Sequence, residues 1–271
     1  MKKKTAPKES KSLKTFFLYS TIVFLLIFVS LSIKTISLIQ QSKFDGGHQF
    51  LVAVVKQGGV EEIVGFNPQL NSISVLIIEN SPLQLSALGK TLGIVTDAKI
   101  EVPADIVLDG DITRTLTSSI IQYNSTKTNL TIIDLLRLTL LSKNVAEKDK
   151  TIENIKFPFQ ENRTDKIIVS LFGDKNISSE NSTLQIINGT EIPGMGRRLE
   201  RVLVNLGANV ISVSTSHTNV ARSKIQYFGS ETYTVEKIKK ILLYSAEKLN
   251  KETIADIVII IGKDAIDEAK F

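Results

Sequence analysis

The chain has no cysteine among its 271 residues, which excludes disulfides, thiolate metal sites, cysteine nucleophiles and a lipidated cysteine. Two histidines leave almost no ligands for a zinc or iron centre, so we expect no metal site. With 15 glycines and 6 prolines the chain is neither collagen-like nor disordered in composition. Its length and its 42% hydrophobic content suit one or two globular domains.

Positive charge is concentrated at the amino-terminal end. The formal net charge is +5, and residues 1–14, with six lysines and one glutamate, carry all of it. The rest of the chain balances at 27 basic and 27 acidic residues. Because that remainder has no basic excess, we expect no nucleic-acid partner.

Residues 15–33 form a run of nineteen residues without a charged side chain. A helix of this length spans roughly 28 Å, close to the hydrocarbon thickness of a bilayer. Lysines are dense before the run and sparse after it, so the positive-inside rule predicts a cytoplasmic tail (1–14) and an extracytoplasmic remainder. A cleaved signal peptide is the alternative, with Ser30 and Ser32 before the cut. Either way the globular part lies outside the cytoplasm, where we expect no nucleotide or other cofactor.

A small mixed α/β domain is predicted over residues 48–145, after a polar stalk (34–47). Three β-branched runs predict an antiparallel meander, at 50–55, 63–66 and 73–78. Helices are expected at 81–92 and 111–123, and another begins at Thr131, where Asp134 completes a capping box. The apolar face of that last helix is expected to consist of Ile132, Leu135, Leu136, Thr139 and Leu140.

A linker is predicted over residues 146–182, because the stretch 143–154 is polar and charged. Within it, residues 164–173 suit either a strand or a short helix. Residues 176–182 have the composition of a linker.

The segment 183–265 gives the clearest pattern, followed by a tail (266–271). Strands are predicted at 184–188, 210–213, 225–228 and 257–261. The helix 197–206 has an apolar stripe of Leu199, Val202, Leu203 and Leu206 and stops at Gly207. A second helix, 235–249, is expected to point Ile238, Ile241, Leu242, Ser245 and Leu249 inward and Lys237, Lys240 and Lys248 outward. This order, β-α-β-β-α-β, has the ferredoxin-like plan of two helices on one face of a four-stranded sheet, and the chain as a whole belongs to the α/β (α+β) class.

Several spaced motifs of this segment match one known family. The first is the stretch Leu184-Gln-Ile-Ile-Asn-Gly-Thr-Glu-Ile-Pro-Gly-Met-Gly-Arg-Arg-Leu, and the later ones are 206–210 and 256–264. Together they resemble the LytR C-terminal domain: a strand ending in Asn-Gly-Thr, a Pro-Gly turn, a helix, a helix-to-strand corner and a closing strand. The likeness covers about residues 182–265. It implies a bacterial envelope protein, with wall-polymer association as the expected role.

Residues 50–145 are more weakly similar to the first half of a LytR-CpsA-Psr (LCP) domain. LCP enzymes transfer a phosphate-linked glycopolymer from a lipid carrier to peptidoglycan, using arginines and acidic residues around a pyrophosphate and a metal. Their third strand runs into an Ile-Pro-Arg-Asp signature, whereas this chain has Ile78-Glu79-Asn80-Ser81-Pro82. Without guanidinium groups a pyrophosphate site lacks most of its charge stabilisation, so we expect a degenerate domain with no catalytic residues.

The candidate polymer-binding site lies where the helix 197–206 begins. Amide donors at a helix start, together with arginines, suit an anion, and Arg197 and Arg201 are expected to share one outward face. The alternative is that these arginines are simply solvated. The predicted residues are Asn188, Gly189, Thr190, Gly194, Gly196, Arg197, Arg198 and Arg201.

We therefore expect a single-pass, non-catalytic envelope protein whose terminal domain binds a wall glycopolymer, peptidoglycan or another envelope protein of the wall-assembly machinery. A divergent LCP-type transferase is the enzymatic alternative. A purely structural interaction domain for another membrane protein is the third interpretation.

Overall fold

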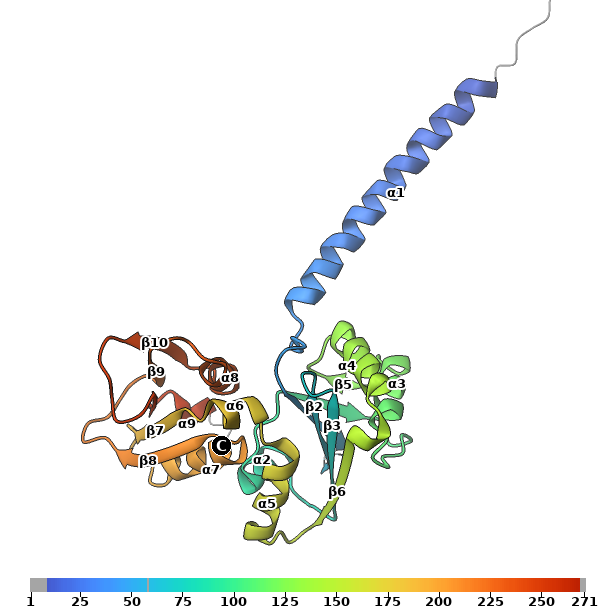
Figure 1. The fold of residues 1–271 in the computed structure, drawn as a ribbon. Coiled ribbons are helices and arrows are strands. Elements are labelled where there is room, and N and C mark those ends of the chain that lie inside the picture. Colours follow the sequence, from blue (N-terminus) through green and yellow to red (C-terminus); the bar gives the residue numbers. More distant parts are fainter. Residues whose placement is uncertain (1–8, 58, 269–271) are drawn as a thin grey trace, which may run out of the picture. The chain divides into compact units, whose positions relative to one another are not determined.

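The computed structural model describes residues 9–57 and 59–268, and the chain divides into two compact units, 1–42 and 43–271. Most of the predicted cytoplasmic tail, residues 1–8, lies outside the described part. The first unit is the helix α1 (Glu9–Gln40), whose segment Thr15–Gln40 is long and apolar enough to cross a membrane (Figure 1). The helix continues seven residues past Ile33, so the first half of the predicted stalk is helical instead.

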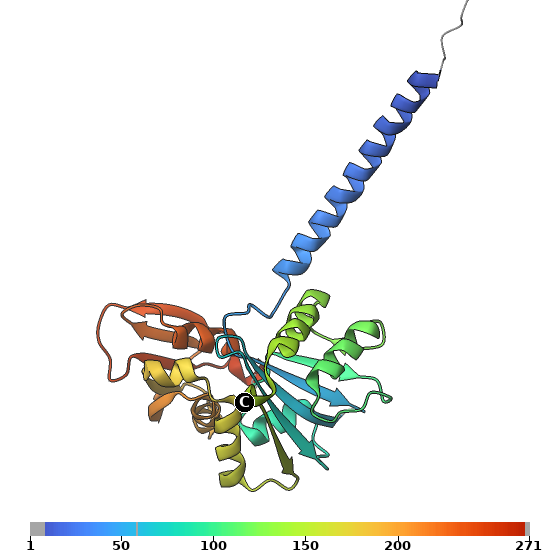
Figure 2. The same cartoon turned by 45° about the vertical axis from the view of Figure 1, so that its right-hand side comes forward.

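The second unit begins with a three-layer α/β/α arrangement (Figures 1 and 2). Its six-stranded sheet has the order β5-β4-β1-β2-β3-β6, with β1 (Phe50–Lys56), β2 (Gly59–Asn67), β3 (Ser72–Glu79), β4 (Ala98–Val102), β5 (Lys127–Thr128) and β6 (Lys150–Lys156). The antiparallel meander β1-β2-β3 is confirmed. Its helices are α2 (Leu85–Leu92), α3 (Ile112–Ile121), α4 (Ile132–Asn144) and α5 (Glu161–Phe172).

Alternation along the central strand explains the two outer layers. On β1, Val52 and Val54 pack with α3 and α4, whereas Leu51 and Ala53 pack with α2 and α5. Both faces of the sheet are therefore buried, which is why β1 reads as a continuous apolar run.

Two of the predicted local signals differ in detail. The cap of α2 is Gln84 and not Ser81, while the capping box of Thr131 and Asp134 on α4 is confirmed. The buried face of α4 is centred on Leu135, Leu138 and Ser142. Two members of the predicted face, Leu136 and Leu140, are 47% and 61% exposed.

The linker predicted over 146–182 is wrong. It contains the short helix η1 (Glu147–Asp149), and then β6 pairs in parallel with β3 at the edge of the sheet. The ambiguous segment 164–173 lies in α5, whose Ile168 and Leu171 are buried under the sheet. Part of 176–182 is the helix α6 (Lys175–Glu180).

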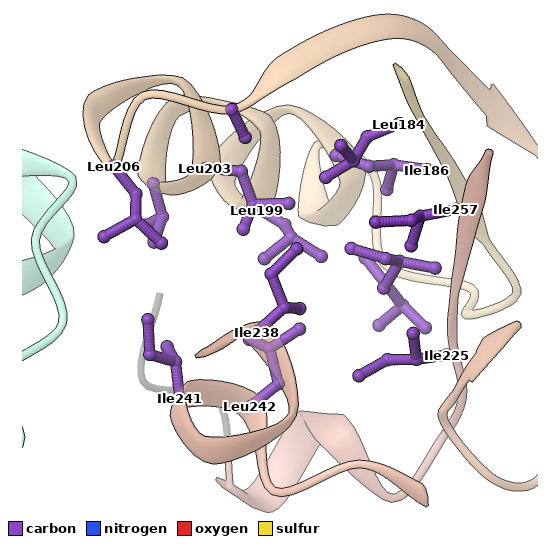
Figure 3. Packing of buried hydrophobic residues seen from close by; sticks show 14 of the residues in the cluster. Leu184, Ile186, Leu199, Leu203, Leu206, Ile225, Ile238, Ile241, Leu242 and Ile257 are labelled. Atoms are coloured by element: carbon purple, nitrogen blue, oxygen red, sulfur yellow. The ribbon is translucent and has the colours of Figure 1, made fainter. Parts of the chain in front are cut away.

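The remaining residues form a second mixed sheet with its own core. The sheet has the order β10-β9-β11-β7-β8, from β7 (Thr183–Asn188), β8 (Asn209–Thr215), β9 (Lys224–Phe228), β10 (Ser245–Leu249) and β11 (Ile257–Ile261). Two helices, α7 (Met195–Asn205) and α8 (Tyr233–Leu242), share one hydrophobic cluster with its inner face. Figure 3 shows Leu199 and Leu203 of α7 meeting Ile238 and Leu242 of α8 beside the strands.

This sheet has five strands and not the predicted four, and its pairing is not ferredoxin-like. The strands β7 and β8 are parallel neighbours, and β9 lies on the other side of β11, so β8 and β9 do not pair with each other. The predicted helix 235–249 ends at Leu242, because Leu243 adopts φ 61° and the chain turns into β10. Lys237, predicted to point outward, is 2% exposed. The predicted tail begins within a short helix, α9 (Ala265–Glu268).

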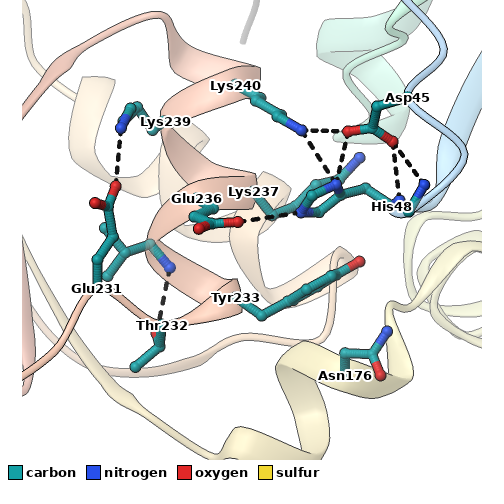
Figure 4. Close-up of polar contacts among 12 residues, drawn as sticks. Asp45, His48, Asn176, Glu231, Thr232, Tyr233, Glu236, Lys237, Lys239 and Lys240 are labelled. Carbon is teal, nitrogen blue, oxygen red and sulfur yellow. Dashed lines mark hydrogen bonds and ion pairs between the residues drawn. The ribbon is translucent and has the colours of Figure 1, made fainter.

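The segment 43–47, predicted as the end of a stalk, is packed onto the fold together with His48. The Phe44 side chain is 4% exposed and belongs to the core between the first sheet and α3 and α4. The imidazole of His48 stacks on the ring of Tyr233 with centroids 4.7 Å apart, and Asp45 pairs with Lys240 (Figure 4). Burial raises the pKa of the Asp45 carboxyl, but hydrogen bonds from Lys240 and the backbone amides of Gly47 and His48 outweigh it and hold the pKa well below its ordinary value.

Candidate functional site

A groove of about 670 Å³ runs between the edge strand β8 and the first turns of α7. The edge strand contributes residues 210–215, the end of β7 contributes Asn188, and the start of α7 with its N-cap contributes Gly194, Gly196, Arg197 and Glu200. Four of the predicted site residues are thus brought together in one concave surface, namely Asn188, Gly194, Gly196 and Arg197. We refer to this surface as the β8–α7 groove.

The Asn-Gly-Thr motif shapes the loop that forms one end of the groove. The amide oxygen of Asn188 accepts hydrogen bonds from the backbone nitrogen and the hydroxyl of Thr190, at 3.0 and 2.7 Å. The amide nitrogen of Asn188 donates to the carbonyl oxygen of Ile192 at 3.0 Å. Both side chains are 5% exposed, so their polar atoms are used inside the loop. Their part in binding is to hold the loop rather than to contact a ligand.

Close packing explains the glycines at the start of α7. A Cβ on Gly196 would lie 2.8 Å from Cγ1 of Val213, so only glycine lets α7 approach β8 this closely. Gly194, the N-cap, has φ 82°, a left-handed conformation that favours glycine. Close packing also explains Gly189, because a Cβ at this position would lie 2.6 Å from Cγ2 of Val220.

The three predicted arginines are separated by the fold. Arg197 is exposed and lines the groove, three residues before Glu200. The guanidinium of Arg198 lies 3.2 Å from Sδ of Met195. Arg201 faces α5, where Nη2 is 2.7 Å from Oδ1 of Asp165 and Nη1 is 3.2 Å from Oε1 of Glu161. The predicted outward pair of Arg197 and Arg201 is therefore wrong, since α7 presents these residues to different neighbours.

Four polar groups of the groove were not predicted. Glu200 lies one turn into α7, and Ser212, Ser214 and Thr215 come from β8. The predicted strand ends at Val213, so the hydroxyls of Ser214 and Thr215 fall outside it. Their pairing with Gln185, Ile187 and Asn188 of β7 places them on a strand at the sheet edge.

The chemistry of the groove suits a ligand with many hydroxyl groups. Its charged side chains are one guanidinium and one carboxylate, which together supply donors and acceptors without a large net charge. Serine and threonine hydroxyls donate and accept, and an edge strand leaves backbone groups unpaired on its outer side. A sugar-containing polymer with an occasional anionic group meets these requirements.

A second cavity, of about 830 Å³, lies in the first domain beside β2 and β3. Its ionisable lining residues are Lys56, Glu61, Glu62 and Glu79, and the ammonium of Lys56 donates to the carbonyl oxygen of Ile106 at 2.8 Å. The stretch that replaces the LCP signature, from Ile78 to Pro82, lines the same cavity. Three carboxylates and one lysine do not fit a pyrophosphate. In the part of the chain that the structure describes, no group of three or more histidine, cysteine or acidic side chains could hold a metal ion.

Comparison with known proteins was made for the whole chain. Residues 181–264 match the family model LytR_C, described as the LytR cell envelope-related transcriptional attenuator. None of the curated proteins matches the chain.

Two solved structures from Listeria show limited similarity. The Lin1025 protein of Listeria innocua is 13% identical, with a TM-score of 0.33, and the alignment covers 46% of this chain and 97% of that one. The Lmo1026 fragment of Listeria monocytogenes is also 13% identical, with a TM-score of 0.19 and coverage of 73% and 100%. Such values carry no argument about function. The family match covers the segment that folds as β7 to β11 with α7 and α8, so residues 181–264 of this chain are similar to the LytR C-terminal domain of the cell-envelope attenuator family.

Proposed function

We propose that this protein is a membrane-anchored, extracytoplasmic envelope protein whose LytR C-terminal domain binds a wall glycopolymer in the β8–α7 groove. The observation that carries the proposal is the groove itself, where Arg197, Glu200 and the β8 hydroxyls line one concave surface. A polymer repeat there would make a few exposed polar contacts, each worth on the order of 0.5–1.5 kcal/mol. Affinity for one repeat would then be millimolar to high micromolar, raised by multivalency along the wall.

The proposed role is non-catalytic. The cavity of the first domain is lined by more carboxylates than cations, and they would repel a lipid pyrophosphate. The two arginines of residues 48–145 do not line this cavity: Arg114 pairs with Asp109 at 2.6 Å, and Arg137 donates to the carbonyl oxygen of Phe44. Purified full-length protein in detergent should neither bind polyprenyl pyrophosphate tightly nor hydrolyse it with magnesium. Metal-dependent turnover would instead support the transferase alternative.

Retention on isolated wall material tests the groove. Arg197→Gln removes the exposed guanidinium and should lower retention several-fold, with a larger loss at low salt than at high salt. The matched control is Arg163→Gln, which removes the same charge from an exposed position on α5. Parent-like retention of Arg197→Gln, or an equal loss in both variants, would contradict groove binding. In the first case Arg197 is merely solvated, and in the second the wall attracts the protein by net charge alone.

Topology is tested separately. A reporter fused after Phe271 that is active only outside the cytoplasm should give signal, because the lysines precede the span. Activity of a cytoplasm-specific reporter at this position would remove the wall polymer as a ligand.

A further inference from the structure

The helix α4 carries an exposed apolar stripe that the fold leaves uncovered. Leu136 and Leu140, one turn apart, are 47% and 61% exposed, and half-buried Ile133 extends the stripe by a turn toward the start of the helix. Single exposed apolar residues are ordinary, as with Val169 of α5, but a stripe along one face points to an apolar environment.

The charges on this helix have one sign. Arg137 and Lys143 are exposed beside the stripe. The single carboxylate in the sequence of α4 is that of Asp134, which is fully buried and accepts hydrogen bonds from the backbone nitrogens of Lys43 and Phe44 at 3.3 and 3.0 Å. The surface of α4 is therefore apolar and basic, which is the composition of a helix that lies in the interface of an anionic bilayer.

The hydrogen bonds of Asp134 also tie the start of α4 to the segment that follows the membrane helix in sequence. The candidate span ends at Gln40, three residues before Lys43, so the Cα atoms of these two residues are at most about 11 Å apart. Arg137 donates to the carbonyl oxygen of Phe44 at 3.3 Å, and His48 and Asp45 are held by α8 a few residues later (Figure 4). The first turn of α4 is therefore hydrogen-bonded to a segment that begins only three residues after the candidate span in sequence.

We propose that the outward face of α4, formed by Ile133, Leu136, Arg137, Leu140 and Lys143, rests on the membrane surface, with the leucines among the lipid headgroups and acyl-chain ends and the two cations against anionic lipid. This inference rests on the membrane anchor of the proposed function. It adds a second, peripheral contact that would set the height and tilt of the wall-binding domain above the bilayer.

The chain has no cysteine, so single-cysteine labelling of the full-length protein tests the contact directly. An environment-sensitive fluorophore is placed at Asn144→Cys, an exposed position at the end of α4 that leaves the stripe unchanged. The protein is reconstituted in phosphatidylcholine–phosphatidylglycerol vesicles containing a lipid with a quencher near the headgroup. We expect the label to lose about a third or more of its fluorescence, whereas a label at Val169→Cys on α5 should lose less than about a tenth.

The double substitution Leu136→Gln and Leu140→Gln, in the Asn144→Cys background, should reduce quenching to the level of Val169→Cys. Both leucines are exposed, so the melting temperature should stay within about two degrees of the parent. Replacing phosphatidylglycerol by phosphatidylcholine should also weaken quenching, because Arg137 and Lys143 lose their counter-charges.

A label at Phe24→Cys, within α1, separates the two proposals when the vesicles contain a lipid whose quencher lies deep in the acyl chain, because Phe24 is near the middle of the candidate span. If it is not quenched by lipid, the anchor itself fails. If it is quenched while the labels at Asn144 and Val169 behave alike, the anchor stands and docking of α4 is overturned. Shielding of the Asn144 label from aqueous iodide without lipid quenching would also overturn the proposal, since a second protein copy would then cover the stripe.

Discussion

The ammonium group of Lys237, on α8 beside the second sheet, donates a hydrogen bond to the backbone carbonyl oxygen of Gln49, just before β1 of the first sheet. The lysine is 2% exposed, and its nearest carboxylate is Asp97, with Nζ and Oδ2 3.8 Å apart. A buried cation therefore joins two segments that are 188 positions apart in sequence. The same carboxylate oxygen of Asp97 accepts from the backbone nitrogen of Leu51 at 2.8 Å, so the junction is a small network.

Lys237→Met tests this network. Methionine keeps most of the volume but leaves the Gln49 carbonyl and Asp97 without their cation, which should lower the free energy of unfolding by about 1–3 kcal/mol. For a domain of this size the Tm would fall by about 3–10 °C. Lys239→Met is the control, because Lys239 is about half exposed and pairs with Glu231 at the surface, where ion pairs contribute little. Equal Tm changes in the two variants would show that the buried hydrogen bond has no net stabilising effect.

The buried carboxyl of Glu62 on β2 should make the stability of the protein fall as the pH rises. Burial raises the pKa of this carboxyl, and the charges of Asp109 and Glu61 add to the rise, although the backbone amide of Gly110 donates to Oε1. Its other oxygen, Oε2, is buried without a hydrogen-bond partner among the described residues. The folded protein therefore holds this proton at a pH where the unfolded chain has lost it. Stability from this group falls as the pH rises from about 4.5 through the raised value.

Glu62→Gln should remove that pH dependence. Glutamine can accept from Gly110 and carries no charge, so the variant should be more stable than the parent by on the order of 1 kcal/mol above neutral pH. The two proteins should converge below about pH 4, where the parent carboxyl is protonated in both states. Denaturant titrations at pH 4 and pH 8 measure the difference. Glu153→Gln, exposed on β6, should change little at either pH; a parent that is more stable than Glu62→Gln at pH 8 would mean that the ionised carboxylate is tolerated.

The hydrophobic periodicity of the sequence predicts most of the helices and strands that have strong apolar patterns. It fails for segments whose conformation depends on pairing with strands that are distant in sequence. The segment Ser245–Leu249 reads as a continuation of α8, because Ala, Glu, Lys and Leu are good helix formers. Parallel pairing with β9 makes it a strand instead, and no glycine or proline marks the break at Leu243. The sequence predicts a linker at the edge strand β6 for a related reason: four consecutive side chains of its seven are exposed, so the strand lacks the alternation of buried and exposed residues that marks a half-buried strand.

Four of the eight predicted site residues line the groove, and three of these, Gly194, Gly196 and Arg197, belong to one local turn and helix start. The role of Arg201 was not, because its partner Asp165 lies 36 positions earlier on α5. An amphipathic pattern shows which face of a helix is polar, but it does not distinguish solvent from the polar side of a neighbouring domain. The same limit applies to Lys237.

Gly189 gives a test of the Asn-Gly-Thr loop. A Cβ there would lie 2.6 Å from Cγ2 of Val220 and 2.8 Å from the carbonyl oxygen of Ile261, and the second contact is with backbone that cannot move freely. Gly189→Ala should therefore cost about 1–3 kcal/mol of stability. Gly47→Ala is the control, because its Cβ would meet only Oδ1 of Asp45 at 3.9 Å. A Gly189→Ala protein with the parental Tm would show that the loop can shift away from β11.

Glu180, at the end of α6, predicts a pH dependence of the opposite sign. Burial raises the pKa of its carboxyl, but hydrogen bonds from the hydroxyl and backbone nitrogen of Thr234 and from the backbone nitrogen of Tyr233 outweigh it, so the pKa is lowered. These donors belong to the first turn of α8, where a negative charge is favoured by the helix dipole. The stability that Glu180 contributes is present above about pH 4.5 and is lost as the pH falls through its folded-state pKa.

Glu180→Gln should cost about 0.5–1 kcal/mol at pH 7, a modest figure because the carboxylate is exposed and screened by solvent. The single oxygen of a glutamine amide cannot accept from the backbone nitrogens of Tyr233 and Thr234 and from the Thr234 hydroxyl together. Glutamine also lacks the negative charge that the start of α8 favours. The cost should shrink toward zero at pH 3, where the parent carboxyl takes up a proton. Thermal unfolding at the two pH values measures this, with Glu231→Gln as an exposed carboxylate whose hydrogen bond is to a lysine side chain. A cost for Glu180→Gln that is the same at pH 3 and pH 7 would mean that shape rather than charge caps α8.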